Sequence, residues 1–387
     1  MLRISFYVPT KIVFHRESIE QVGKEASSFG RKALIVCGRS FARRSGYLDK
    51  IRGLLEREGL RVVIFDKVEP NPSFETVEKG SKLARDENVD VVIGFGGGSA
   101  MDAAKGIAVL ASKGGAITDY VYPHEVTGDV LPIIAIPTTC GTGSEVTRYA
   151  VFSDLRRKRK VTMVGYPILP KVALLDPLVL RSLPPNLTAY TGMDALSHAI
   201  EAYLSKRSNP LSDLLALESI RLIFWNLKEA CRGSLEAREK VFYASMLAGM
   251  AINCTGTIMV HGMGYYLTMY HDIHHGLANA FLLPFAVEYN APALPSKMTR
   301  LADVLGMGPL SPSEVGRAIS RAICRLEDEV NIPVSLSEVG VSEDELDDMV
   351  KEALSYHRNL ANNPRKVTPE DVRTIYLKAL KGRGSCG

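Results

Sequence analysis

Residues 90–105 read DVVIGFGGGSAMDAAK, and this stretch decides the fold. Its first six residues form a short apolar run rich in β-branched side chains, which predicts a buried strand. Three glycines follow, and an alanine-rich segment with helical periodicity comes after them. A glycine-rich turn between a strand and a helix leaves backbone N–H groups at the helix N-terminus, where they can hold a diphosphate. The stretch therefore predicts one strand–helix unit of a nucleotide-binding sheet, although it lacks the GxGxxG spacing.

The alternation of strand and helix continues through the first half of the chain. Further short apolar runs predict buried parallel strands at residues 33–37, 61–65, 132–136 and 172–176. This pattern is typical of a doubly wound, mostly parallel sheet. After residue 184, long helical patterns such as 211–225 and 237–250 replace the β-branched runs. We therefore expect an α/β domain over residues 1–184 and an all-α domain over 185–387, with the active site in the cleft between them.

The predicted helical domain contains a candidate metal site. Asp194 and His198 are four residues apart, so a helix places both side chains on one face. His261 and His275 follow, but an unbroken helix would separate them by about 21 Å. We therefore predict that the helix breaks within residues 269–276, which contain a histidine cluster and a glycine. One carboxylate with three imidazoles suits Fe(II), or Zn, Co or Ni in its place; taken singly, each histidine could be an ordinary core or surface residue.

Composition narrows the functional classes. The chain has 387 residues, 46% hydrophobic and 23% charged, which is typical of a globular protein with two cores. Its net charge of +4 is scattered except for the basic run 156–160, which lies in a predicted hairpin without interleaved aromatic residues, so we expect no nucleic-acid partner. No segment reaches eighteen uninterrupted apolar residues and no signal peptide is evident, so we expect a cytoplasmic protein without a membrane partner.

Two residue types give further expectations. The six cysteines form no CxxC pair, which predicts reduced and mostly buried thiols, with Cys386 in a frayed tail. Gln21 is the sole glutamine in a chain rich in Arg, Lys and Glu. That composition favours a thermophilic source.

A second glycine-rich turn follows the predicted strand at 132–136. Residues 137–145 read PTTCGTGSE and place hydroxyl groups and glycines at the carboxyl edge of the sheet. Each turn alone could be a plain tight turn, but together they favour a nucleotide. In the first turn, Asp102 comes three residues after Ser99, so the sequence by itself favours a helix capping box. The alternative is that Asp102 faces the nicotinamide side of the cleft.

Four motifs, in order, carry a family resemblance: GGGSAMDAAK, PTTCGTGSEVT, GMDALSHAIEAY and HHGLANAFLLP. Together they closely resemble the iron-containing (group III) alcohol dehydrogenase family, which shares its fold with glycerol dehydrogenase and dehydroquinate synthase. The match runs through almost the whole chain. It implies a homodimer or larger homo-oligomer, and it implies that the metal ligands are Asp194, His198, His261 and His275.

The resemblance also implies a set of residues that bind the cofactor. It assigns the diphosphate to Gly97, Gly98 and Ser99, the adenine and ribose side to Thr138, Thr139 and Thr142, and the rest of the cofactor cleft to Asn71, Val151 and Lys160. Lys160 belongs to the basic run, so its assignment replaces the expectation of a simply solvated side chain.

The implied activity is that of a metal-dependent alcohol dehydrogenase or aldehyde reductase. A dication lowers the pKa of an alcohol, and NAD(P) then accepts hydride from it. A pocket lined by the apolar or weakly polar side chains of Tyr149, Phe152, Met163 and Tyr265 would suit a small primary alcohol or aldehyde. Three alternatives stay open: a polyol dehydrogenase of the glycerol type, a dehydroquinate synthase-like lyase, and a silent metal- or nucleotide-binding protein.

The first departure from the family pattern concerns the cofactor. Many family members carry an aspartate just after the first strand of the nucleotide-binding unit, where it accepts the ribose hydroxyls. Here the sequence is Gly38, Arg39 and Ser40, which leaves space, a cation and a hydroxyl suited to a 2′-phosphate. We therefore expect NADP(H) to be preferred over NAD(H), unless Arg39 is an ordinary exposed loop residue.

Other departures concern proton transfer and an early turn. Tyr265 stands where relatives commonly have a second histidine four residues after the ligand. A phenol can hydrogen-bond the reacting oxygen but is a poor base at neutral pH. His271 or His274 could relay the proton instead. His15 replaces a glycine that relatives usually have, and we expect it to be only a turn residue.

Overall fold

The computed structural model describes residues 4–385, and its chain divides into two compact units. One unit contains Val8–Thr139 and Gly143–Ser182. The other contains residues 183–385 together with residues 4–7 and Cys140–Thr142. The chain thus passes between the units at residues 140–142 as well as near residues 8 and 183.

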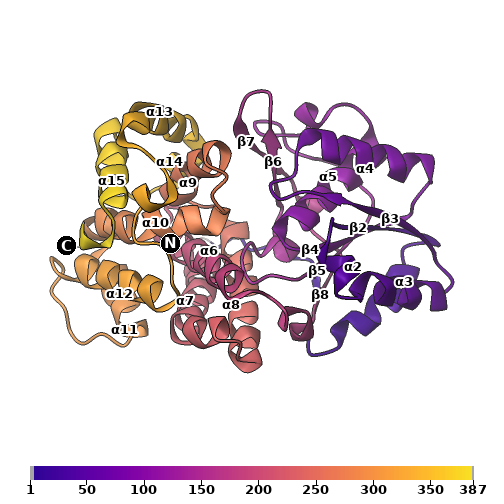
Figure 1. Ribbon diagram of the computed structural model, residues 1–387, viewed down its shortest axis with the longest axis horizontal. Coiled ribbons are helices and arrows are strands. Elements are labelled where there is room, and N and C mark those ends of the chain that lie inside the picture. Colours follow the sequence, from indigo (N-terminus) through magenta and orange to yellow (C-terminus); the bar gives the residue numbers. More distant parts are fainter. Residues whose placement is uncertain (1–3, 386–387) are drawn as a thin grey trace. The chain divides into compact units, whose positions relative to one another are not determined.

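The first unit is built on a parallel six-stranded sheet in the order β1-β8-β5-β4-β2-β3. Its strands are β1 (Lys11–Phe14), β2 (Lys32–Gly38), β3 (Arg61–Val68), β4 (Val91–Gly96), β5 (Ile133–Pro137) and β8 (Val172–Leu175). The predicted parallel strands are therefore confirmed. Figure 1 shows α4 and α5 on one face of this sheet and α2 and α3 on the other, as in a doubly wound fold.

The helices of this unit follow the strands as the sequence pattern predicts. They are α1 (Val22–Ser27), α2 (Phe41–Arg44), α3 (Tyr47–Arg57), α4 (Phe74–Asp86) and α5 (Gly98–Lys113). Helix α5 lies against β4, and its residues from Ala103 to Leu110 are buried in the core. Such burial explains why this segment is rich in alanine: small side chains let the helix approach the sheet closely.

The predicted hairpin is present as the antiparallel pair β6 (Tyr149–Asp154) and β7 (Arg159–Val164). Phe152 and Met163, which we expected in a substrate pocket, are fully buried members of the hydrophobic core. That expectation was wrong because their faces of the strands pack against α5 and its neighbours. Lys160, within the basic run, is only 4% exposed.

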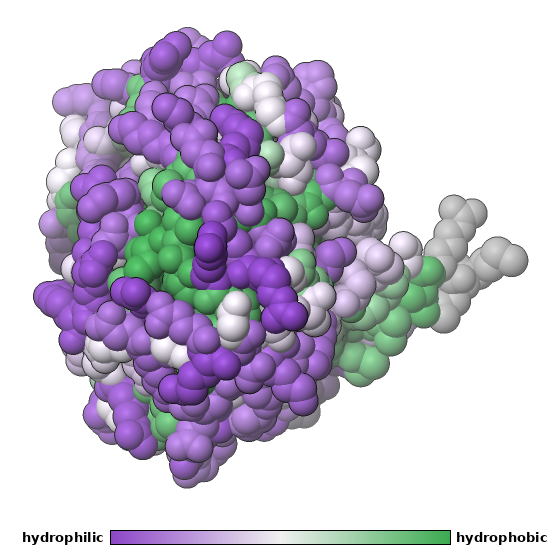
Figure 2. Space-filling model, turned by 90° about the vertical axis from the view of Figure 1, so that its right-hand side faces the viewer, coloured by the Kyte–Doolittle hydropathy of each residue, from purple (hydrophilic) through white to green (hydrophobic). Residues whose placement is uncertain are grey.

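The edge strands of the sheet are β1 and β3. Figure 2 looks onto the side that carries β3 in Figure 1 and shows an apolar area ringed by hydrophilic side chains. Val62, Val63 and Ile64 of this strand are only partly buried, whereas the charged residues Arg61 and Lys67 flank them. Charges beside an edge strand oppose its pairing with another chain.

In the second unit, helices are the regular elements of the described residues. Its helices are α6 (Pro185–Leu204), α7 (Pro210–Cys231), α8 (Leu235–Thr255), α9 (Met259–Tyr270), α10 (His275–Asn290), α11 (Pro295–Val304), α12 (Val315–Glu329), α13 (Leu346–Ser355), α14 (His357–Asn362) and α15 (Pro369–Lys381). Proline occupies the first position of α6 and α7, where its missing N–H would have no partner. Helix α6 is almost wholly buried from Thr188 to Leu204.

The predicted helix break is confirmed. Helix α9 ends at Tyr270 and α10 begins at His275. Asp272, between them, adopts a left-handed conformation with φ of 51°, which an aspartate tolerates better than most residues. The break reverses the chain and lets His261 and His275 approach each other.

Within residues 4–385, no single helix is long and apolar enough to cross a membrane. Helices α8 and α9 meet such a criterion only as a pair bent by 110°.

One expectation about the cysteines was wrong. Cys37, Cys140, Cys231 and Cys254 are not disulfide-bonded, but Cys324 on α12 is. Counting CxxC pairs finds only cysteines that are close in sequence, whereas a disulfide needs closeness in space. Cys386, for which we expected a frayed tail, lies outside the described residues.

Candidate functional site

The four predicted metal ligands come together inside the helical unit. Helix α6 carries Asp194 and His198, α9 carries His261, and α10 begins at His275. One ligand atom from each of Asp194, His261 and His275 lies within 4.8 Å of the other two. The Nε2 atom of His198 lies 2.8 Å from Nε2 of His261. One carboxylate and three imidazoles therefore converge on a small volume.

The protonation of the two facing imidazoles tests whether a metal fits. Nδ1 of His198 lies 3.3 Å from the carbonyl oxygen of Gly141, which can only accept, so this nitrogen carries the proton. Nδ1 of His261 donates to the carboxylate of Glu201. In the neutral rings, both Nε2 atoms then present lone pairs to each other across 2.8 Å. Two lone pairs repel at this distance unless a proton or a metal ion lies between them, so this donor set can hold a metal ion in place of a proton.

For Asp194 and His198, electrostatics favour the deprotonated form that a metal requires. Burial lowers the pKa of His198 to about 4. Burial opposes ionisation of Asp194, but the charges of His198, His275 and His261 outweigh it and lower the pKa of Asp194 to about 2. Its carboxylate is therefore ionised and the His198 ring is neutral at physiological pH.

Glu201 is a functional residue that our sequence analysis missed. It is fully buried on α6, seven residues after Asp194 and on the same helix face. One carboxylate oxygen accepts from His261 and the other accepts from the backbone N–H of Ile258 at 2.7 Å. Burial lowers the pKa of His261, but Glu201 outweighs it and the pKa is raised. Glu201 thus fixes the tautomer and orientation of the His261 ring. The sequence signal that we overlooked was its position in GMDALSHAIEAY, three residues after His198 and seven after Asp194.

Asn279 is a second residue that we missed. It lies on α10 four residues after His275, and its Nδ2 donates to Asp194 Oδ1 at 2.9 Å. The same Nδ2 lies 3.2 Å from Nε2 of both His261 and His275. Its Oδ1 is buried and has no hydrogen-bond partner within residues 4–385. Buried polar atoms usually have a hydrogen-bond partner. The lack of one for Asn279 Oδ1, beside the predicted ligands, supports a site that binds a further group.

Tyr265 lies directly against a predicted ligand. Its ring stacks on His275 with a centroid distance of 5.6 Å and an interplanar angle of 12°. Tyr356 packs against it with a centroid distance of 4.7 Å. The tyrosine is 8% exposed, so its ring is held by packing next to the ligand cluster.

The two candidate relay histidines have different environments. His271 Nε2 lies 2.7 Å from Glu345, which also accepts from the hydroxyl of Tyr266 at 3.1 Å. His274 precedes α10; its Nδ1 accepts from the N–H of Gly276 and its ring lies 5.5 Å from that of Tyr190. Burial lowers the pKa of His274, and the charge of Asp194 acts in the opposite direction.

The predicted cofactor turns meet at the carboxyl ends of β4 and β5. Helix α5 begins at Gly98, and the preceding Gly97 has extended backbone. A Cβ on Gly97 would lie 3.2 Å from Thr139 Oγ1, so the absence of a side chain lets the two turns approach closely. The backbone N–H of Thr138 donates to Gly96 at 2.9 Å, and that of Asn71 donates to Ser99 Oγ at 3.2 Å.

Two further predicted cofactor residues lie on the hairpin, and one lies in the other unit. Lys160 on β7 donates to Asn71 Oδ1 at 2.7 Å and to Ser153 Oγ at 3.0 Å. Val151 lies on the paired strand β6. Thr142 belongs to the helical unit with Cys140 and Gly141.

The capping role predicted for Asp102 was wrong. Helix α5 begins at Gly98, before Ser99, and has no side-chain cap. The Asp102 carboxylate instead accepts from Ser144 Oγ at 2.7 Å and from the backbone N–H of Val151 at 2.8 Å. Because glycines start the helix early, Asp102 lies past the first turn and faces inward.

The predicted phosphate determinants lie where β2 ends. Gly38 is the last residue of the strand, and Ser40 precedes α2 without capping it. Arg39 Nε reaches the carbonyl of Lys67 at 3.4 Å, and its guanidinium lies 3.9 Å from Glu69. The Arg39 side chain is 67% exposed, so its cation remains accessible.

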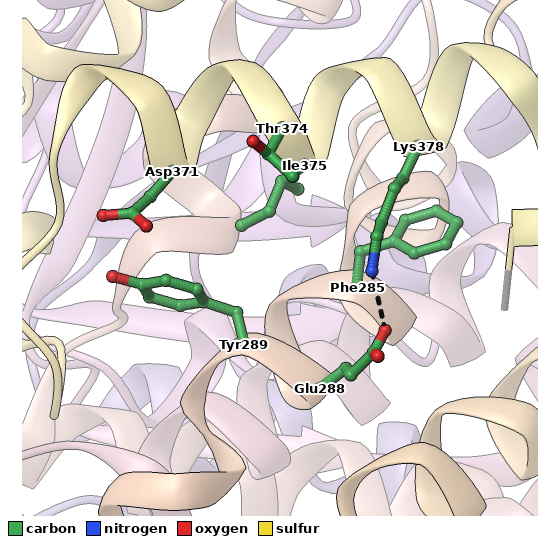
Figure 3. A pocket seen from close by; sticks show the side chains of 7 residues that line it. All are labelled: Phe285, Glu288, Tyr289, Asp371, Thr374, Ile375 and Lys378. Carbon is green, nitrogen blue, oxygen red and sulfur yellow. Dashed lines mark hydrogen bonds and ion pairs between the residues drawn. The ribbon is translucent and has the colours of Figure 1, made fainter. Parts of the chain in front are cut away.

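A separate surface pocket lies between α10 and α15 (Figure 3) and has a volume of about 200 Å³. Lys378 and Glu288 form an ion pair of 3.0 Å along one side of it. Its lining contains none of the predicted ligands: Phe285, Glu288, Tyr289, Asp371, Thr374, Ile375 and Lys378. Because Lys378 is paired with Glu288 and no predicted ligand lines the pocket, we do not assign the active site to it.

Comparison with known proteins finds two adjoining family matches. Residues 9–177 match the model of the iron-containing alcohol dehydrogenases, and residues 188–380 match the C-terminal domain of the same family. The chain is 39% identical to a 1,3-propanediol dehydrogenase of Citrobacter freundii, over 97% of this chain and 98% of that protein.

Other relatives use different cofactors. An NAD-dependent methanol dehydrogenase of Bacillus methanolicus is 34% identical over 97% of this chain and 100% of its own length. An NADPH-dependent butanol dehydrogenase of Clostridium saccharobutylicum is 32% identical over 96% of both chains. Among solved structures, a 1,3-propanediol oxidoreductase superposes with a TM-score of 0.93 at 39% identity, covering 97% of this chain and 100% of that one.

Proposed function

Because this chain belongs to the iron-containing alcohol dehydrogenase family, we propose that it interconverts a small primary alcohol and its aldehyde with NADP(H) as the preferred cofactor. The observation that carries the proposal is the convergence of Asp194, His198, His261 and His275, with Nε2 of His198 only 2.8 Å from Nε2 of His261. Neutral imidazoles and an ionised carboxylate are the donors that a divalent metal needs.

These four residues would hold the metal, Fe(II) or Zn, Ni or Co in its place. When bound, such a dication supplies Lewis acidity, which eases proton loss from an alcohol and polarises an aldehyde carbonyl. Glu201 keeps the Nδ1 proton of His261, so that Nε2 stays a donor of its lone pair. Asn279 orients the carboxylate of Asp194.

The glycine-rich turns would hold the cofactor. The backbone N–H groups at the start of α5, with Gly97, Gly98 and Ser99, suit its diphosphate. Thr138, Thr139 and Thr142 would line the adenine and ribose side, with Asn71, Asp102, Val151 and Lys160 completing the site.

NADP(H) preference rests on Gly38, Arg39 and Ser40. No carboxylate occupies these three positions, and Arg39 offers an exposed cation. A 2′-phosphate gains a charge-assisted contact there, whereas NAD(H) does not. Relatives use either cofactor, so the two kcat/KM values must be compared directly.

Proton movement would involve Tyr265 and His274. The Tyr265 phenol can hydrogen-bond the reacting oxygen, while its stacking holds the His275 ring. His274 can then exchange the proton with water. His271 is the weaker candidate because Glu345 engages its Nε2.

We also propose a cytoplasmic homodimer or larger homo-oligomer from a thermophile, acting on small molecules and not on nucleic acids or membranes. The single glutamine among many charged residues supports the thermophilic origin. Light scattering would give the oligomeric state, and a midpoint of thermal unfolding below about 65 °C would contradict the thermophilic origin.

The decisive experiment is an anaerobic assay of short aldehydes with NADPH and NADH, on metal-stripped protein before and after addition of Fe(II). Turnover that returns with Fe(II), and is faster with NADPH, is expected. A tenfold preference for NADH would contradict the cofactor assignment. Absence of turnover with every aldehyde would contradict the substrate class; glycerol and other polyols would be assayed next.

A further inference from the structure

One buried lysine has no role in the proposed chemistry. Lys105 on α5 is 0% exposed. Its ammonium donates to Ser144 Oγ at 2.8 Å, to the carbonyl of Thr147 at 2.9 Å and to the carbonyl of Tyr149 at 2.7 Å. These three bonds use all the donors of the group. The acceptors belong to the segment that leads from the second glycine-rich turn into β6.

Ser144 bridges this lysine to Asp102. Its hydroxyl accepts from Lys105 and donates to Asp102 Oδ1 at 2.7 Å. The other oxygen of Asp102 accepts from the backbone N–H of Val151 at 2.8 Å. Helix α5 therefore holds residues 144–151 through Lys105 and Asp102, with Ser144 shared between them.

Two carboxyl groups partly offset the burial of the ammonium. Asp102 and Glu145 are the carboxylates that act on Lys105, and Lys160 also acts on Asp102. Burying an ammonium is unfavourable unless hydrogen bonds and opposite charges compensate it. Apolar packing would avoid that penalty, so the contribution of Lys105 lies in the main-chain carbonyls that it holds in place.

This network connects the two parts of the predicted cofactor site. The first turn of α5 carries Gly98 and Ser99, and the hairpin carries Val151 and Lys160. We infer that Lys105 and Ser144 are positioning residues that fix the hairpin residues relative to the diphosphate turn, and so set how tightly and in which orientation the nicotinamide cofactor is held. The inference rests on the proposed function, because that function supplies the cofactor.

The test uses Ser144→Ala, a small change that removes the shared hydroxyl. Its control is Ser112→Ala, near the C-terminal end of the same helix, where the hydroxyl accepts from the backbone N–H of Leu131 at 2.8 Å. Both variants lose a hydroxyl that holds a neighbouring segment to α5. Only Ser144 belongs to the network around Lys105. Comparing the two variants therefore separates an effect on cofactor positioning from a general effect on stability.

Three quantities are measured on each purified protein: the midpoint of thermal unfolding, the Kd for NADPH from fluorescence titration, and the primary deuterium isotope effect on kcat with labelled NADPH. For Ser144→Ala we expect a Kd about tenfold higher, because hydrogen bonds to charged groups are lost. The isotope effect should rise, because a loosely held ring makes hydride transfer more rate-limiting. Ser112→Ala should keep both values within about twofold of those of the unchanged protein, since a contact worth under about 0.4 kcal/mol shifts Kd no further.

Lys105→Met is a second variant, to be used if it folds, and should raise the Kd for NADPH further. Equal Kd and isotope effect in Ser144→Ala and Ser112→Ala, with similar losses of thermal stability, would overturn the inference while leaving the proposed function intact. If the unchanged protein binds neither NADPH nor NADH, the proposed function fails, and the inference fails with it.

Discussion

The ligand cluster of the helical unit and the glycine-rich turns of the sheet unit differ in the groups that they offer for binding. The cluster is made of side chains from three helices, with Glu201 and Asn279 behind them. The turns offer mainly backbone N–H groups, and side chains such as Lys105 and Asp102 act from behind to hold that backbone. A site made of side chains should lose its ligand when one of these side chains is substituted. A site made of backbone groups should lose affinity only in part when a supporting side chain is substituted.

The largest expected effect is the loss of a ligand. Asp194→Asn keeps the shape of the side chain but removes the negative charge that the dication needs. We expect less than one tenth of the metal to remain and kcat/KM to fall by about 10³-fold, since a Lewis acid contributes several kcal/mol. Metal content by mass spectrometry and kinetics with added Fe(II) would measure this. Asp303→Asn, exposed on α11, is the control; full metal content in Asp194→Asn would exclude Asp194 as a ligand.

A smaller effect is expected behind the ligands. Glu201→Gln removes the carboxylate that accepts from His261, and outer partners of this kind typically contribute 10–100-fold in metal affinity. Competition with a chelator would give the metal Kd, which should rise by about that factor. Glu218→Gln, which breaks an exposed ion pair with Arg221 on α7, should leave it unchanged. Equal metal affinities in both variants would assign Glu201 to packing alone.

On the sheet side, Arg39→Ala should lower kcat/KM for NADPH by roughly tenfold, the effect of losing one charge-assisted contact to an accessible phosphate. The value for NADH should stay the same. Arg57→Ala is a matched control, because Arg57 ends α3 just before β3 begins and is also exposed. Parallel losses with both cofactors would show that Arg39 does not recognise the 2′-phosphate.

The pH dependence of kcat distinguishes the two candidates for proton relay, His271 and His274. His274→Ala should shift the pH dependence of kcat for alcohol oxidation and lower kcat several-fold, because general acid–base groups act near their own pKa. His271→Ala should leave the profile unchanged, since its ring is paired with Glu345. Unchanged profiles in both variants would remove these two histidines from proton transfer.

The smallest effect concerns stability. Burial raises the pKa of Glu145 from 4.5 to about 7, so the folded chain holds this proton over a pH range where the unfolded chain has lost it. The stabilisation is complete below pH 4.5 and is lost as the pH rises towards 7. Glu145→Gln should therefore reduce the fall in thermal midpoint between pH 5 and pH 8. Glu78→Gln, exposed on α4, should retain the full fall; the same slope in both would refute the assignment.

Spacing and periodicity predict much of this molecule. The parallel strands, the switch to helices and the break between α9 and α10 follow from local patterns, and the break follows from arithmetic on the distance between His261 and His275. These features depend on neighbours in sequence, which is why a single sequence reveals them.

The missed features depend on partners far along the chain. Glu201 meets the N–H of Ile258, 57 residues away, and Lys105 meets Tyr149, 44 residues away. The capping role of Asp102 failed because it assumed that the helix begins at Ser99. The expectation for Cys324 failed for the same kind of reason: bonding in space was inferred from spacing in sequence.

The passage of Cys140–Thr142 into the helical unit has a consequence for dissecting the protein. A fragment that starts at residue 183 contains all four ligands, yet it lacks Gly141, whose carbonyl faces the Nδ1 proton of His198. In such a fragment His198 could adopt the other tautomer and turn its proton towards the metal. All four ligands lie within one segment of the chain, but Gly141, whose carbonyl fixes the protonation of His198, lies outside it. A truncated helical half should therefore bind metal less selectively and more slowly than the whole chain.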